Sequence, residues 1–202
     1  MRALTSLVLA SASPRRLALL GALGLDVRVV PSRVVEGDRP GETPQAVALW
    51  YARLKADAVA AREPSEFVVA ADTVVDLDGL ALGKPKGDDD AAGMLHRLAG
   101  REHTVHSAYA VRDAREGVSF EALSSTRVCF VPLDDATIRT YVASGDPHDK
   151  AGAYGIQGAG AALVERIHGD FYTVMGFPLG DFLRRLAAHG YAIGAAQPFA
   201  AT

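Results

Sequence analysis

The stretch LVLASASPRRLALLGALG, from Leu7 to Gly24, decides the start of the fold. Its first three residues are an apolar run typical of a buried strand, and the leucines after Pro14 recur along one side of a helix. Ser13 is a good N-cap, and Pro14 suits the first helical position. The stretch therefore predicts a strand over 6–10, a helix over 14–23 and a left-handed stop at Gly24.

Two arginines, Arg15 and Arg16, stand in the first turn of that helix. A helix N-terminus already carries partial positive charge, so two cations there are mildly unfavourable. An anion held by backbone N–H groups, hydroxyls and guanidinium groups would explain them. Two solvated arginines are the simpler alternative, but Ser13, the helix start and the preceding strand favour a phosphate site.

The composition is that of an ordinary soluble globular protein, with 202 residues, 49% hydrophobic, 22% charged and a formal net charge of −3. A nearly neutral chain gives no support for binding of nucleic acid by bulk electrostatics, so an anion needs a local cationic cluster. The single cysteine, Cys129, excludes an internal disulfide and is expected to be a small core residue. The apolar stretch at the N-terminus is too short to span a bilayer, so we expect a cytoplasmic protein with no membrane partner.

Strands and helices alternate through the first half of the chain and give way to a meander. We expect one α/β domain over residues 1–202, without a linker or repeat. A long helix over 44–62, capped by Thr43, carries Val47, Tyr51, Leu54 and Ala58 along one face. The other expected strands are 27–31, 67–77, 102–113, 118–131 and ALVERIH, and the other expected helices begin at Asp88 or Asp89, cover 135–143 after Asp134, and follow Pro178.

A second informative stretch is FVVAADTVVDLDGLALGKP, residues 67–85. Asp72 interrupts an apolar strand, where a carboxylate is costly to bury unless it meets a cation or a metal. A two-residue turn at 78–79 sets Thr73 opposite Lys84, and one extra residue at Gly83 would bring Asp72 and Lys84 together. An internal ion pair is one interpretation. We favour the other, a carboxylate that holds a divalent ion or activates water, with a lysine on phosphate.

Other clusters give weaker indications. The glycines of DKAGAYGIQGAG, residues 149–160, would let backbone approach a ligand, but their order fits neither a P-loop nor a dinucleotide motif. His103 and His106 are three apart in a predicted strand, so they point to opposite faces and are poor joint metal ligands. The acids over 88–90 are expected to cap a helix, and no Ser-His-Asp arrangement is favoured by local pattern.

Taken together, LASASPRR, ADTVV, LGKP, DKAGAYGIQG and VERIHGDFYTVMGFPL resemble, in that order, the Maf family of nucleoside triphosphate pyrophosphatases. The resemblance covers nearly the whole chain. It implies an α/β fold with a mixed sheet flanked by helices and two lobes around a central cleft, as in the related inosine triphosphatases. It also implies hydrolysis of the α–β phosphoanhydride with a divalent cation, Mg²⁺ or Mn²⁺, in a protein that is commonly a homodimer.

The resemblance also assigns residues. It implies phosphate binding by the loop of Ser13, Arg15 and Arg16, a proton acceptor at Asp72 and a base-contacting glutamine at Gln157. Lys55 matches a family lysine, Lys84 a second phosphate-binding lysine, and Glu36 an acidic position after the second strand. As a mechanistic hypothesis, the cations neutralise the triphosphate while Asp72 with Glu36 orients the metal and takes a proton from water.

Arg15, Thr73 and Gln157 occupy the positions at which the family's subgroups differ in substrate. Asp72-Thr73 together with GIQG resembles the subgroup that acts on dTTP and UTP. A glutamine amide can pair with two neighbouring groups on the acceptor–donor–acceptor edge of uracil or thymine, which agrees with that choice. The alternatives are the same reaction on 7-methyl-GTP or another non-standard nucleotide, and a non-catalytic nucleotide-sensing regulator of cell division.

One departure concerns the loop after the second strand, where the family often reads S-D-V-D-E. This chain reads Ser32-Arg33-Val34-Val35-Glu36, so Glu36 alone remains as an acid. The sequence therefore gives little support for a metal held by several carboxylates of this loop.

Overall fold

A computed structural model describes residues 1–37 and 39–193. The last nine residues of the expected domain, 194–202, lie outside the described part. The strands are β1 Arg2–Leu4, β2 Ser6–Leu9, β3 Asp26–Val29, β4 Phe67–Leu77, β5 Leu80–Leu82, β6 Glu102–Asp113, β7 Val118–Phe130, β8 Val164–His168 and β9 Tyr191–Ile193. The helices are α1 Pro14–Gly21, α2 Pro44–Ala60, α3 Asp88–Leu98, α4 Asp135–Ala143, α5 Phe171–Met175 and α6 Leu179–Ala188, with 3-10 turns η1 Asp146–Asp149, η2 Ala151–Ala153 and η3 Gly158–Leu163.

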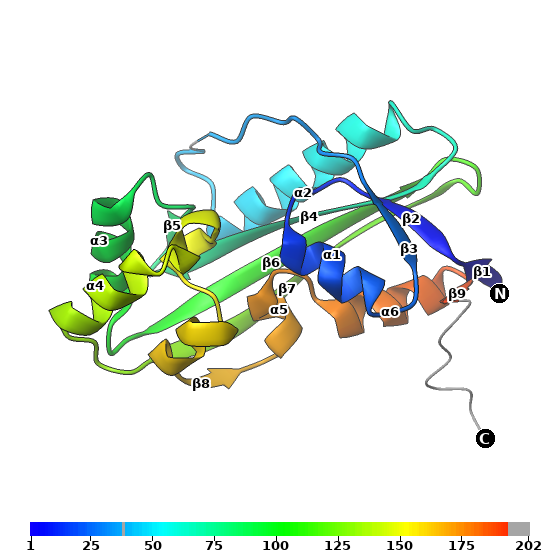
Figure 1. Cartoon of the computed structure of the whole chain (residues 1–202). Coiled ribbons are helices and arrows are strands. Elements are labelled where there is room, and N and C mark those ends of the chain that lie inside the picture. The colour runs from blue at the N-terminus through cyan, green and yellow to red at the C-terminus, as the bar shows by residue number, and fades with distance from the viewer. Residues whose placement is uncertain (38, 194–202) are drawn as a thin grey trace, which may run out of the picture.

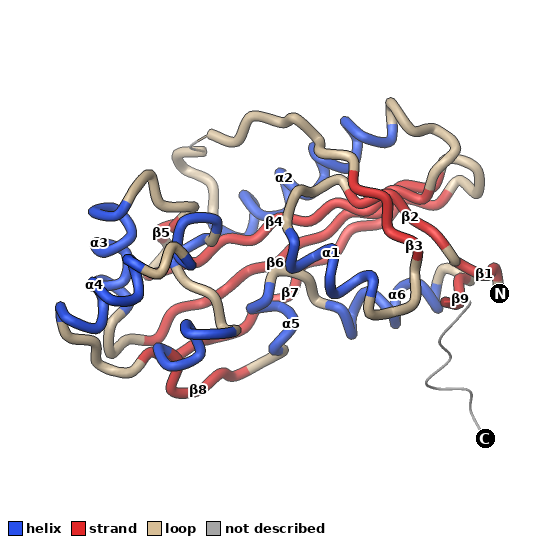
Figure 2. The backbone as a smooth tube through the Cα atoms, viewed as in Figure 1, coloured by secondary structure: helices blue, strands red, loops and turns tan. Residues whose placement is uncertain are grey.

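The architecture is a mixed seven-stranded sheet flanked by helices, which confirms the expected fold class (Figure 1). The strand order is β3-β2-β4-β6-β7-β8, with β5 paired to β4 as the return arm of a hairpin. β2 runs parallel to β3 and β4, and the remaining neighbours are antiparallel. The first and last strands, β1 and β9, form a separate parallel pair at one end of the molecule (Figure 2).

Helix α2 packs on one face of β4 and β6 through small residues. Ala48, Ala52 and Ala56 are fully buried and recur every four residues, so they form one stripe along the helix. The stripe meets the valines and alanines of the same sheet face, which allows a close approach of helix and sheet. The expected apolar face was wrong in this respect: Leu54 is 38% exposed, and Tyr51 alone of the four residues is buried.

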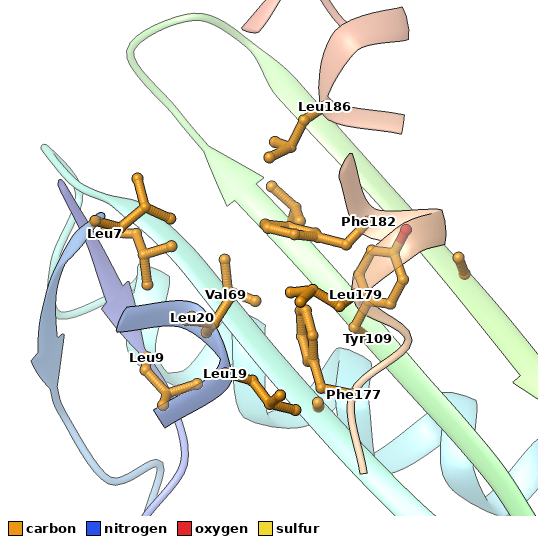
Figure 3. Packing of buried hydrophobic residues seen from close by; sticks show 14 of the residues in the cluster. Leu7, Leu9, Leu19, Leu20, Val69, Tyr109, Phe177, Leu179, Phe182 and Leu186 are labelled. Atoms are coloured by element: carbon orange, nitrogen blue, oxygen red, sulfur yellow. The ribbon is translucent and has the colours of Figure 1, made fainter. Parts of the chain in front are cut away.

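The opposite face of β4 and β6 is covered by α1 and α6, and this is where the largest core lies (Figure 3). Tyr109 of β6 is at its centre, with aromatic contacts to Phe120, Phe177 and Phe182. The labelled side chains of this cluster are Leu7, Leu9, Leu19, Leu20, Val69, Tyr109, Phe177, Leu179, Phe182 and Leu186.

A second lobe lies at the far end of the long strands, where α3 and α4 pack on β5 and on the ends of β4, β6 and β7. The strands thus run continuously between two cores, one at each end. None of the helices within residues 1–37 and 39–193 has the length and apolar character that a bilayer crossing needs.

Most predicted elements are confirmed, and the differences lie at their ends. Ser13, Thr43 and Asp134 cap their helices as expected, each accepting from a backbone N–H three residues on. Helix α1 ends at Gly21 rather than at 23, although Gly24 does take the left-handed conformation, at φ +78°. Helix α3 starts after Gly87 without a side-chain cap, so the acid expected in that role lies inside its first turn.

Candidate active site

A cleft of about 1260 Å³ lies between the two lobes. It is lined by the β2–α1 loop, the β3–α2 loop, α2, the middle of β4, the β5 hairpin and the segments 146–158 and 174–176. Its lining holds seven Arg and Lys side chains against five Asp and Glu side chains, in a chain of net charge −3. The cleft is therefore a local cationic site on an otherwise slightly acidic protein.

The structure brings all the sequence-predicted site residues to this one cleft. They come from six separate stretches of sequence and are Ser13, Arg15, Arg16, Glu36, Lys55, Asp72, Thr73, Lys84 and Gln157.

Arg16 is held in a fixed position at the start of α1. Its Nε donates to the carbonyl of Gly176 at 2.9 Å, Nη1 to Ser11 Oγ at 3.0 Å and Nη2 to Thr73 Oγ1 at 2.9 Å. These bonds use three of the five N–H donors of a guanidinium group. Burial lowers the pKa of Arg16, and the nearby charge of Asp72 opposes that shift. The result is a preorganised positive charge beside the helix N-terminus.

Arg15 points to the other wall of the cleft. Its Nη1 lies 2.9 Å from Asp149 Oδ2, and Asp149 also lies 2.7 Å from Lys150 Nζ. The pKa of the Asp149 carboxyl is lowered because the hydrogen bonds and charges of Lys150 and Arg15 outweigh the cost of burial. Arg15 thus joins the first helix to the glycine-rich segment, a connection between residues 134 positions apart.

Asp72 and Lys55 form a buried ion pair at the base of the cleft. Lys55 Nζ is 2.6 Å from Asp72 Oδ1, and the two side chains are only 8% and 9% exposed. The same ammonium is 2.6 Å from Glu36 Oε1 at the rim, where the glutamate side chain is 49% exposed. Burial raises the pKa of the Asp72 carboxyl, although the charge and hydrogen bond of Lys55 oppose that shift.

The expected partnership of Asp72 with Lys84 is wrong. Leu77 does pair with Leu80 across the predicted turn, but β5 ends at Leu82 and its Gly83 carbonyl accepts from Gly152 N instead. The β4–β5 register begins at Val75, so it does not reach Thr73, which on the other edge of β4 pairs with Ser107 of β6. Lys84 remains exposed on the cleft wall, free to meet an anion from solvent.

Local sequence gave little sign of three supporting groups. Tyr51 holds the β3–α2 loop, since its hydroxyl accepts from Gly37 N at 2.8 Å and donates to Gly37 O at 2.7 Å. Ser107 lies 2.9 Å from Thr73 Oγ1 and donates to the carbonyl of Thr173. Gly176 accepts from Arg16 and takes φ +107°. Tyr51 and Ser107 are polar residues within apolar elements, and this pattern could have indicated their supporting role.

The two histidines set aside in the sequence are structural. His103 is buried, with its Nε2 2.7 Å from the hydroxyl of Tyr154, and burial lowers its pKa to about 4. His106 bridges Ser125 and Asp76 at 2.7 and 3.1 Å, which is a Ser-His-Asp contact that local pattern did not indicate. Neither His103 nor His106 is among the described residues that line the cleft.

The donor set of the cleft fits a divalent cation that also binds phosphate. Asp72 and Glu36 both supply carboxylate oxygens, and both lie against the same ammonium group. Mg²⁺ is commonly bound by one or two carboxylates together with substrate phosphates, so two acids suffice.

The chain is similar in sequence to known proteins. A family model described as Maf-like protein matches residues 6–189. A protein of Thermus thermophilus is 49% identical over 185 residues, which is 92% of this chain and 95% of that protein. A protein of Desulfotalea psychrophila is 46% identical over 180 residues, or 89% and 92% of the two chains. Both are named dTTP/UTP pyrophosphatase.

Among solved structures, the fold is similar to the Ham1 protein of Staphylococcus aureus. The TM-score is 0.44 at 17% identity, over 62% of this chain and 72% of that one.

Proposed function

The chain belongs to the Maf family, and from this premise we propose that it is a hydrolase that converts dTTP and UTP to the monophosphate and pyrophosphate. Relatives at 46% and 49% identity over most of the chain carry the name dTTP/UTP pyrophosphatase. The observation that carries the chemistry is the buried Asp72–Lys55 pair at the base of a cationic cleft.

The triphosphate would lie against the N-terminus of α1. Arg16 offers a positive charge whose position is already fixed by Ser11, Thr73 and Gly176, so little reorganisation is needed as negative charge develops on the leaving pyrophosphate. Arg15 would exchange its bond to Asp149 for a phosphate oxygen, and Lys84 approaches from the opposite wall.

Asp72 is suited to take a proton from the attacking water. A general base works best when its pKa lies near the operating pH, and burial moves the Asp72 pKa upward from its ordinary value. Lys55 holds the carboxylate in one orientation through a 2.6 Å contact. Glu36, at the other side of the same ammonium, keeps a second carboxylate at the cleft rim.

A divalent cation, Mg²⁺ or Mn²⁺, belongs to the proposal. Asp72 and Glu36 are the residues that would hold it. When bound, it supplies further neutralisation of the triphosphate charge.

Thr73 and Gln157 have different roles in substrate binding. The hydroxyl of Thr73 is engaged by Arg16 and Ser107, so Thr73 acts by positioning the arginine. Gln157 is exposed on the cleft wall, where its amide is available to the base edge.

The test is product analysis with a panel of ribo- and deoxyribonucleoside triphosphates in Mg²⁺ or Mn²⁺. We expect pyrophosphate and a monophosphate, concentrated on dTTP and UTP, and a loss of roughly 100-fold or more in Asp72→Asn because a positioned base contributes about 10²–10⁴-fold. Asp76→Asn is the matched control, since Asp76 lies on the same strand but outside the lining among the described residues.

Two outcomes would contradict the proposal. Release of orthophosphate with a diphosphate would place cleavage at the wrong bond. Nucleotide binding without turnover in the wild-type protein would favour a sensing regulator. A homodimer in the cytoplasm, also part of the proposal, is tested separately by light scattering on the purified protein and by cell fractionation.

A further inference from the structure

An open polar face of the sheet brings three metal-binding side chains together away from the cleft. Glu102 on β6 pairs directly with Cys129 on β7, and His168 on β8 lies opposite Arg127, two residues before the cysteine. Residues two apart in a strand point to the same side, so all three side chains share one face. One ligand atom of each lies within 4.8 Å of the other two.

The contacts within this cluster already orient its donors. Cys129 Sγ donates to Glu102 Oε2 at 3.3 Å, while the other oxygen, Oε1, is 3.2 Å from Arg127 Nη1. Arg127 therefore fixes the carboxylate so that its remaining oxygen turns toward the sulfur. An outer partner that orients a ligand in this way is usual around protein metal sites.

We propose that Glu102, Cys129 and His168 form a Zn²⁺ site. Thiolate, imidazole and carboxylate are the ligands that zinc takes in proteins, and a soft thiolate disfavours Mg²⁺ and Ca²⁺. Tetrahedral zinc with bonds of about 2.0–2.3 Å separates its ligand atoms by roughly 3.3–3.8 Å. Cys129 Sγ and Glu102 Oε2 are already 3.3 Å apart, and rotation of the exposed His168 side chain closes the remaining gap. Water takes the fourth position.

The local charges permit a dication. Arg127 and Arg166 lie on the same face, but each is paired, Arg127 with Glu102 and Arg166 with Glu165 at 2.9 Å. Loss of the thiol proton on metal binding adds a further negative charge. The arginines are therefore neutralised, and the thiolate attracts the metal.

The consequence of such a site is a cross-link at an edge of the sheet. β8 is the last strand of the order, and within residues 1–37 and 39–193 it pairs with β7 and no other strand (Figure 2). Its pairing is interrupted between Cys129 and Phe130, where the register shifts. Zinc bound by residues of β6, β7 and β8 would fasten this irregular edge. Along the chain, β8 lies between the cleft-lining segments 146–158 and 174–176, so bound zinc would also restrain the strand that connects them.

The site is independent of the proposed function. None of its three residues lines the cleft in the part of the chain that the structure describes. It therefore has a test that does not depend on turnover.

The test is titration of the metal-free full chain with Co²⁺, followed by Zn²⁺ competition in calorimetry. Cys129 is the chain's single cysteine, so a thiolate-to-cobalt band in the near ultraviolet reports this site alone. We expect one equivalent of Co²⁺ to give that band with the visible spectrum of a tetrahedral site, and Zn²⁺ to abolish both. Cys129→Ser should lose the band and weaken Zn²⁺ binding by more than the 10–100-fold typical of an outer partner.

His168→Gln is a second arm, because His168 is exposed and its replacement does not touch the core. We expect a comparable loss of Zn²⁺ affinity and a shifted cobalt spectrum. His96→Gln, an exposed histidine beside Asp135, is the matched control and should bind as the wild type does. Cobalt binding without the thiolate band, or equal Zn²⁺ affinity in His168→Gln and wild type, would overturn the proposal.

Discussion

At the scale of single residues, the cleft holds two kinds of side chain. Some charged groups are fixed by protein contacts before substrate binds, and other polar groups are exposed and can contact the substrate. Arg16 donates to three protein oxygens and Lys55 contacts two carboxylates, so both are held in place. Removing one member of a buried ion pair leaves an uncompensated charge, at a cost of about 3–5 kcal/mol. Lys84 and Gln157, by contrast, are exposed. We infer that the fixed groups serve the reaction common to all substrates and the exposed ones serve selection.

Gln157→Ala tests that division. Loss of the amide should lower the ratio of kcat/KM for UTP over CTP by roughly 5- to 140-fold, because an unmet hydrogen bond costs about 1–3 kcal/mol. The kcat with UTP should change much less than the ratio, because Arg16 and Asp72 are untouched. Gln45→Ala on α2 is the matched control, outside the lining among the described residues. An unchanged UTP/CTP ratio would remove Gln157 from base recognition.

The family resemblance named residues that the structure gathers in one cleft, whereas the pairing expected from the hairpin was wrong. The energetic rule that a buried acid needs a cation was right for Asp72, yet the cation is Lys55 and not Lys84. The hairpin count reached only as far as Leu82, where β5 ends. Lys55 lies 17 positions away on another element, and no local spacing reports that separation.

At the scale of elements, the approach of α2 to the sheet decides whether Lys55 reaches Asp72. The stripe of Ala48, Ala52 and Ala56 keeps the helix close to β4, and Lys55 projects from the same side of the helix. Asp72 shares its sheet face with Ala70 and Val74, which pack against this stripe. The ion pair is therefore a consequence of small side chains as much as of charge.

Ala52→Leu should widen that contact. Additional methylene groups in a close-packed core cost about 1–3 kcal/mol, so we expect the free energy of unfolding to fall by that amount. Ala58→Leu on the same helix, where the residue is half-buried and outside the stripe, should change the free energy by about 0.5 kcal/mol or less. Urea unfolding of the two variants beside the wild type makes the comparison. Equal losses would mean that α2 has room to move away from the sheet.

The helix α2 was predicted with nearly the right bounds, but the wrong face of it was expected to be buried. Periodicity weighs large side chains most, and it selected Leu54, which is 38% exposed. Alanine contributes little to a hydrophobic pattern. Lys55, beside the stripe, also argued against burial of that face, because lysine is rarely buried. A helix cap depends on residues three positions apart in sequence. The capping roles of Thr43 and Asp134 could therefore be predicted without tertiary information.

At the scale of the whole molecule, the strand order joins parts of the chain that no local pattern connects. The alternation of strands and helices predicted an α/β fold, and the resemblance of five sequence blocks to a family implied a mixed sheet around a cleft. Neither placed β8 beside β7 nor paired β1 with β9, since these contacts join segments far apart in sequence. Both pairings concern short strands of three to five residues, which carry weak periodicity.

The free energy of unfolding should depend on pH through His103. This residue of β6 contacts Tyr154, which belongs to the cleft-lining segment 146–158. Its ring packs edge-on against Phe130 and Tyr154, and burial lowers its pKa to about 4. An unfolded histidine has a pKa of about 6.5, so between these values the unfolded chain binds more protons than the folded one. The stabilisation is thus present above pH 6.5 and is lost as the pH falls toward 4. The difference between the folded and unfolded pKa values of His103 corresponds to about 3 kcal/mol in the free energy of unfolding.

His103→Gln isolates that contribution, because glutamine retains polarity without titrating. Urea unfolding of wild type and variant at pH 7.5 and 4.5 gives four free energies, and the quantity of interest is the difference between the two pH responses. We expect the wild type to lose more stability on acidification than the variant, since carboxylates common to both titrate equally. A parallel loss in the two proteins would show that the His103 ring is protonated in the folded state at low pH without cost, and that its packing between β6, β7 and Tyr154 opens to water.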